Sequence, residues 1–186
     1  MLRASSRATA RSVMNTVLAP PEIAASTLEA LVRQHVDTLV TYATHLVGDP
    51  QEAIDYVSAG IHHARRFPPA SLDREGAAVL FRAVTRACRQ RQRFPPEPRG
   101  LAKLFRKPVP LLSLGADVAS AARVNTVKRA LMATALDRRA ALLLRDLAGL
   151  DYRGVGISLE CSPETAARLV AAARREFGGI YRDIAF

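Results

Sequence analysis

Hydrophobic residues recur along most of the chain at intervals of three and four, which places them on one face of an α-helix. The first stripe covers residues 26–47 and stops at Gly48, a residue type that commonly follows a helix C-terminus. Asp49 and Pro50 then have the character of an N-cap and a first helical residue. Strand-like alternation is nearly absent, so the pattern predicts an all-α protein.

The stripe pattern predicts three helices in the first half of the chain. The second of them runs from Pro50 to the Pro68-Pro69 pair, and the third spans about residues 73–92. Their inward faces are expected to carry apolar side chains, namely Ile54, Val57, Ile61, Ala64, Leu80, Phe81, Val84, Ala87 and Cys88.

Four more helices are expected in the second half of the chain. They lie near residues 124–136, from Asp137 to Gly149, from Asp151, and from a cap at Ser162. Between the two halves the helical pattern dissolves into a segment with five prolines, Pro95, Pro96, Pro98, Pro108 and Pro110. Proline lacks a backbone N–H and interrupts helices. The sequence therefore predicts two small helical domains and two irregular segments: a flexible basic arm over residues 1–22, a three-helix domain over 23–93, a Pro-rich basic linker over 94–120, and a four-helix domain with a helix-turn-helix over 121–186.

Positive charge dominates the chain, with 27 Lys and Arg against 17 Asp and Glu and a net charge of +10. Such an excess indicates a polyanionic partner, most often nucleic acid, although it also serves solubility. Eight of the basic residues fall within residues 86–107, where Glu97 is the one acid. A run of this kind tracks a phosphate backbone, and the residues in it that we expect to contact DNA are Arg86, Arg89, Arg91 and Arg93.

Other classes of protein fit the sequence poorly. Cys88 and Cys161 lie far apart without the close ligand spacing of a zinc site, so both are expected in helical cores in a reducing cytoplasm. No apolar run is long enough to span a bilayer. No catalytic motif is recognisable, so neither an enzyme activity nor a cofactor is expected.

Residues 136–177 follow the plan of a DNA-binding helix-turn-helix: helix, glycine stop, short helix, tight turn and longer helix. Arg168 could read a guanine edge, and Ser162 or Thr165 could hold a phosphate at the helix N-terminus. Alternatives without DNA contact stay open, in which Ser162 serves only as an N-cap and Arg168 is only solvated. The expected DNA contacts of this segment are Ser162, Glu164, Thr165, Arg168, Arg174 and Arg175.

The residue string LLLRDLAGLDYRGVGISLECSPETAARLVAAARREF resembles the C-terminal promoter-binding domain of extracytoplasmic-function sigma factors, which belong to the sigma-70-like family. The earlier string TLEALVRQHVDTLVTYATHLVGDPQEAIDYVSAGIHHARRF is similar to the first domain of the same family, and VLFRAVTRACRQRQRF resembles the last helix of that domain. The resemblance covers about residues 26–180. The positions that carry it are Gly48, Asp49, Ala53, Asp55, Val57, Leu80, Phe81, Arg82, Arg86, Leu136, Arg139, Leu143, Leu144, Arg145, Gly149, Leu150, Tyr152, Val155, Leu159, Thr165, Arg168, Ala173, Arg174 and Phe177.

This resemblance implies a sigma-like initiation factor of the bacterial cytoplasm. Its first domain would bind RNA polymerase core through Asp55, Ser58 and His62, and its last domain would bind promoter DNA. An anti-sigma factor or a co-activator is a further possible partner of such a protein. Family members use an aromatic side chain to melt DNA, whereas this chain has no Trp and carries Phe81 on an inward stripe.

Two alternatives to a sigma-like initiator stay open. One is a sigma mimic, which binds an anti-sigma factor or another protein without melting DNA. The other is a regulator that uses only the helix-turn-helix and binds DNA as a dimer.

Overall fold

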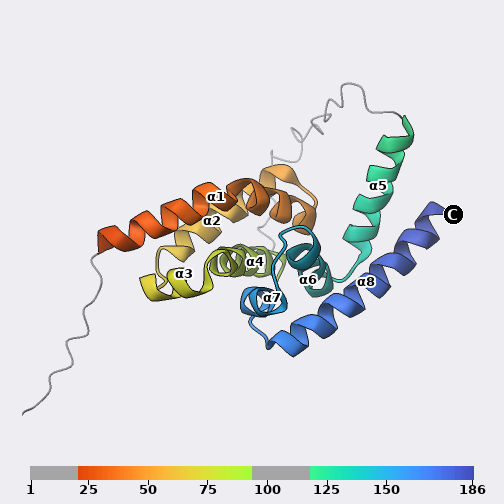
Figure 1. Ribbon diagram of the computed structural model, residues 1–186. Helices are drawn as coiled ribbons and strands as arrows, with labels where there is room; N and C mark the ends of the chain where they lie inside the picture. The colour runs from red at the N-terminus through yellow and green to blue at the C-terminus, as the bar shows by residue number, and fades with distance from the viewer. Residues whose placement is uncertain (1–20, 94–117) are drawn as a thin grey trace, which may run out of the picture.

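The computed structural model describes residues 21–93 and 118–186, with side chains for residues 27–90 and 120–186. The described residues form helices and no strands, which confirms the prediction of an all-α protein (Figure 1). The helices are α1 (Pro21–Val47), α2 (Pro50–Ala64), α3 (Pro69–Glu75), α4 (Ala77–Arg93), α5 (Val118–Ala133), α6 (Leu136–Asp146), α7 (Tyr152–Leu159) and α8 (Pro163–Ala185).

Two helix starts follow the capping chemistry expected from the sequence. Asp49 precedes Pro50, and its carboxylate accepts hydrogen bonds from the backbone N–H of Gln51 at 2.8 Å and of Glu52 at 3.2 Å. Ser162 precedes Pro163 in the same way, and its hydroxyl accepts a bond from the N–H of Thr165 at 3.2 Å. Each cap satisfies a backbone donor that has no partner within its own helix.

The number of helices in the first half was predicted wrongly, because α1 to α4 are four helices and not three. The predicted helix over residues 73–92 is interrupted at Gly76, which has a φ of 52°. Glycine adopts this left-handed region at little cost, so it ends α3 and lets α4 start in a new direction.

Two helices begin inside segments that were predicted to be irregular. Helix α1 begins at Pro21, inside the predicted arm, and α5 begins at Val118, inside the predicted linker. Proline favours the first turn of a helix, and the alanines that follow Val118 have the highest helix propensity of any residue. The rest of the predicted arm and linker, residues 1–20 and 94–117, lies outside the described residues.

The core of α1 to α4 is built around two aromatic rings. Tyr42 is fully buried and Phe81 is 1% exposed. Their rings meet edge to face with centroids 5.3 Å apart. The hydroxyl of Tyr42 lies 2.7 Å from the hydroxyl of Thr85, which in turn donates to the carbonyl of Phe81. Phe81 is therefore a core residue, and in this packing it is not accessible to a DNA base.

Helices from both halves of the chain contact one another. Helix α4 packs against α7, and α1 packs against α5 and α6, so the buried side chains form one cluster (Figure 1). The buried hydroxyl of Ser158 in α7 donates to the carbonyl of Ala78 in α4 at 3.1 Å. Gly48 faces the side chain of Met132 so closely that an added Cβ would lie 2.8 Å from its sulfur. The packing does not confirm the predicted division into two separate domains.

Two predictions about single side chains were wrong. Ile54 was expected in the core but is 50% exposed, because Ala53, Tyr56 and Val57 occupy the buried side of α2. Cys161 was expected in a helical core but lies half-buried in the turn between α7 and α8. None of the helices in the described part of the chain has the length and apolar character needed to cross a bilayer.

Candidate nucleic-acid interface

The turn between α7 and α8 has the tight geometry of a helix-turn-helix. Glu160 takes a left-handed conformation with a φ of 60°, and the N–H of Cys161 donates to the carbonyl of Gly156 at 2.9 Å. A Cβ at Gly156 would lie 2.7 Å from the carbonyl oxygen of Cys161. The turn can therefore close only because residue 156 has no side chain.

One side of α8 is buried and the other is open to solvent. Ala166, Val170 and Ala173 are buried, on the helix that packs against α6 and α7. The predicted DNA contacts of the first turns lie on the open side, where Ser162, Glu164, Thr165, Arg168 and Arg175 are all exposed. A helix with one buried and one open face is what a recognition helix needs to enter a major groove.

The first turn of α8 keeps Glu164 in its charged form. The pKa of this carboxyl lies below its usual value, because the carboxylate accepts hydrogen bonds from its own backbone N–H and from the Ser162 side chain. The positive charge of Arg168 lowers this pKa further. An acid suits the positive end of a helix, but it repels a DNA phosphate. Glu164 is therefore better suited to accept a hydrogen bond from a base than to face the backbone.

Arg174 was predicted as a DNA contact, but it is engaged within the protein. Its guanidinium donates to both carboxylate oxygens of Asp146, at 2.5 and 3.2 Å, and this hydrogen bonding raises the pKa of Arg174. The pair fastens α8 to α6. In this arrangement Arg174 stabilises the position of α8 rather than offering a free charge.

Two of the α4 arginines predicted to bind DNA also face acidic residues of the second half of the chain. Arg89 places Nε at 3.0 Å and Nη2 at 2.9 Å from Oδ1 of Asp137. Arg86 lies 3.9 Å from Glu160, a contact in which both side chains are more than half exposed. The side chains of Arg91 and Arg93 lie outside the described residues.

Two further cations lie close to the start of α8 and were not among the predicted DNA contacts. Arg82 and Arg153 line a hollow of about 580 Å³ together with the α7–α8 turn and Ser162. Arg82 also lies 4.8 Å over the ring of Phe67 and 3.5 Å from Glu75, so it is partly engaged. The position of Arg153 at the start of the first helix of the motif was the signal that could have identified it.

The three residues predicted to bind polymerase all lie exposed on α2. Ser58 and His62 line an open groove of about 340 Å³ between α1 and α2, and Asp55 follows the exposed Ile54. We refer to this feature as the α1–α2 groove; it is lined by Val36, Val40, Ile54, Val57, Ser58, Ile61, His62 and Arg65. Apolar side chains in a groove with a polar rim are typical of a surface that docks another protein. Ile54 belongs to this surface, and the sequence prediction missed it by assigning it to the core.

The described residues offer neither a cluster of metal ligands nor a cysteine with a lowered pKa. No three His, Cys, Asp or Glu side chains of this part of the chain lie close enough together to hold a metal ion. Burial raises the pKa of the Cys88 thiol to about 12 and raises that of Cys161 as well, so neither favours the reactive thiolate form.

No protein-family model matches the chain, and no curated protein matches it in sequence. The open face of α8 and the α1–α2 groove are therefore the features from which a function has to be inferred.

Proposed function

We propose that this protein is a sigma-like transcription initiation factor that binds RNA polymerase core and directs it to specific promoters. The observation that carries the proposal is the tight turn between α7 and α8 together with the open face of α8. Thr165, Arg168 and Arg175 are exposed on α8, while its opposite side is buried. The net charge of +10 favours approach to DNA.

Each exposed residue has a distinct role in this proposal. Arg168 lies one turn into α8 and reads a base edge in the major groove, with guanine the preferred partner of arginine. Ser162 already caps α8, so its role is to hold the helix end. Arg153 and Arg82, beside that end, contact backbone phosphates, since a helix N-terminus favours anions.

RNA polymerase core binds in this proposal at the α1–α2 groove, with Asp55, Ser58 and His62 as the polar contacts. Ile54 is 50% exposed and supplies the apolar contact at the centre of this surface. Because the groove lies on α1 and α2 and the recognition face lies on α8, both partners can be bound by one molecule.

A sigma mimic that binds a protein and not DNA is the alternative, and two observations favour it. Arg86, Arg89 and Arg174 all face carboxylates of the chain itself, so fewer cations are free for phosphate than the sequence implied. The buried Phe81 also fits a protein that does not capture a flipped base. Such a mimic would use the α1–α2 groove to bind an anti-sigma factor.

The replacement Arg168→Ala tests the DNA-binding half of the proposal. We expect the variant to lose about 1–3 kcal/mol of binding free energy on the preferred duplex and to discriminate less at one base position. The measurement is a titration of fluorescent duplexes that differ at single positions.

The matched control for this titration is Arg33→Ala, which removes an exposed arginine from α1. It should leave both affinity and base preference nearly unchanged. If both variants lose the same affinity on every duplex, Arg168 contributes only its positive charge and does not read a base. The absence of DNA binding by the unmodified chain would favour the mimic.

A further inference from the structure

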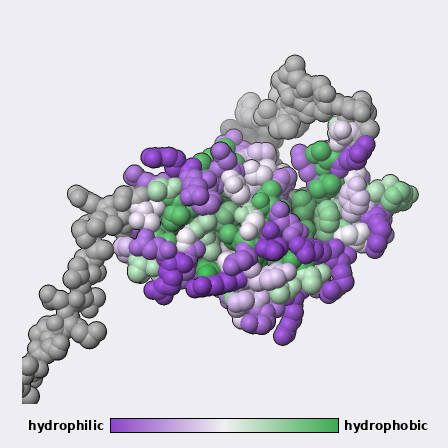
Figure 2. Space-filling model, in the orientation of Figure 1, coloured by the Kyte–Doolittle hydropathy of each residue, from purple (hydrophilic) through white to green (hydrophobic). Residues whose placement is uncertain are grey.

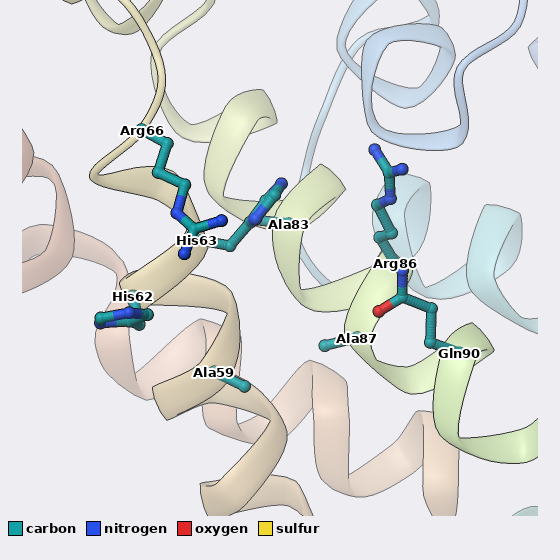
Figure 3. A pocket seen from close by; sticks show the side chains of 8 residues that line it. All are labelled: Ala59, His62, His63, Arg66, Ala83, Arg86, Ala87 and Gln90. Atoms are coloured by element: carbon teal, nitrogen blue, oxygen red, sulfur yellow. The ribbon is translucent and has the colours of Figure 1, made fainter. Parts of the chain in front are cut away.

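A pocket between α2 and α4 shares only His62 with the α1–α2 groove, and its other lining residues have no part in the function proposed above. It has a volume of about 240 Å³ (Figure 3). Three of its lining side chains are small, namely Ala59, Ala83 and Ala87. We refer to this feature as the α2–α4 pocket.

The pocket exists because the two helices approach closely at a glycine and carry small residues next to it. A Cβ at Gly60 would lie 2.7 Å from the Val84 side chain and 2.9 Å from its backbone nitrogen. This contact sets the separation of α2 and α4, and the adjacent alanines leave the space between them unfilled. A larger side chain at residue 87 would occupy that space.

The rim of the α2–α4 pocket consists of nitrogen-bearing side chains that can donate hydrogen bonds. His62, His63 and Arg66 come from α2, and Arg86 and Gln90 come from α4. Figure 3 shows His63 directed from α2 toward α4, and Arg86 extended from α4 toward α7. None of the lining residues carries a carboxylate.

The two arginines on this rim are available to a ligand. Arg66 is exposed and forms no ion pair with a carboxylate of the described residues. Arg86 has Glu160 at 3.9 Å, but both side chains are more than half exposed. Exposed pairs of this kind contribute little, so a better anion can displace Glu160 from Arg86.

We propose that the α2–α4 pocket binds a phosphate group. Two guanidinium groups can form charge-assisted, bidentate hydrogen bonds to phosphate oxygens, and the imidazoles and the Gln90 amide supply further donors. The volume of about 240 Å³ is below the range of about 300–1,000 Å³ typical of drug-sized ligands. It suits a phosphate with a small attached group, which comes either from a phosphorylated metabolite or from a DNA backbone.

Calorimetric titration of the full chain with inorganic pyrophosphate tests the site. Arg66→Ala removes a rim charge, and Ala87→Leu fills the pocket without changing any charge. Each is expected to weaken binding by about tenfold or more, which for Arg66→Ala is the equivalent of one charge-assisted hydrogen bond. The control Arg74→Ala removes an exposed arginine of α3 that does not line the pocket, and binding should stay within about twofold of the unmodified chain.

A second titration with a short DNA duplex distinguishes the two sources of phosphate. If Arg66→Ala and Ala87→Leu weaken both ligands, and pyrophosphate competes with DNA, the pocket binds a backbone phosphate. If they weaken pyrophosphate alone, it binds a phosphorylated small molecule. The proposal is overturned if pyrophosphate does not bind, or if the Arg74→Ala control weakens pyrophosphate binding as much as Arg66→Ala does. Thermal unfolding of each variant verifies that it is folded.

Discussion

At the scale of single residues, Arg139 shows how a charge can be accommodated in the core. Its side chain is 7% exposed, yet its guanidinium pairs with no carboxylate in the described residues. It instead donates to three backbone carbonyls, those of Leu46 at 2.7 Å, Met132 at 2.8 Å and Thr134 at 2.9 Å. These carbonyls belong to the ends of α1 and α5, where helices leave acceptors without partners.

Replacement of Arg139 by methionine should destabilise the fold strongly. The substitution keeps much of the volume but leaves three carbonyls without this donor, at a cost of roughly 1–3 kcal/mol for each one that stays buried. We expect the free energy of unfolding to fall by at least about 3 kcal/mol in urea denaturation.

The neighbouring Arg138 provides the control for this experiment. It is exposed and pairs with Glu176 at 2.5 Å on the surface. Surface ion pairs are worth about 0–1 kcal/mol, so Arg138→Met should cost no more than that. Equal costs for the two variants would contradict the role given to Arg139.

At the scale of helices and turns, the α7–α8 turn depends on the missing side chain of residue 156. Gly156→Ala places a methyl group 2.7 Å from a backbone oxygen, which cannot move without opening the turn. We expect a loss of about 1–3 kcal/mol of stability, as for other overpacked sites, and weaker DNA binding. Thermal unfolding and a duplex titration measure the two effects.

Gly178→Ala is the matched control, because Gly178 also lies inside a helix but has open space where a Cβ would be added. Alanine favours helix over glycine by about 1 kcal/mol, so this variant should be more stable than the unmodified chain. A Gly156→Ala variant with unchanged stability would show that the turn tolerates a side chain.

The helices that the sequence predicted best are those with a local chemical signal. The Asp49-Pro50 and Ser162-Pro163 pairs marked two helix starts correctly, because capping depends on neighbouring residues alone. The break between α3 and α4 was missed, since a glycine such as Gly76 is also tolerated inside a helix. The exposure of Ile54 was missed because periodicity shows which residues share a face but not how wide the buried part of that face is.

At the scale of the whole molecule, the ion pairs of α4 connect the two halves of the chain. Arg89 pairs with Asp137 and Arg86 with Glu160, across 48 residues in the first case. The sequence predicted basic, exposed side chains at these positions. It could not predict their acidic partners, because pairs distant in the chain are set by the packing of α4 against α7 and of α7 against α6.

Release of Arg89 should strengthen DNA binding. In Asp137→Asn the arginine loses its carboxylate partner and becomes free to contact a phosphate. Because an exposed ion pair is worth about 0–1 kcal/mol, the affinity for DNA should rise by at most about fivefold. Duplex titration at low salt measures this gain.

Asp183→Asn is the control for Asp137→Asn, since it makes the same change of charge at an exposed position of α8. Its affinity for DNA should rise by less than about twofold, an effect of net charge alone. If the two variants gain equally, Arg89 takes no part in DNA binding.

Capture of RNA polymerase core by the immobilised chain tests the central claim most directly. Ile54→Asp and Val124→Asp place the same charge at apolar side chains that are 50% and 51% exposed, but only Ile54 lies in the α1–α2 groove. We predict that the unmodified chain and Val124→Asp retain the core enzyme and that Ile54→Asp loses it. An unmodified chain that retains no core enzyme would contradict a sigma-like initiation factor.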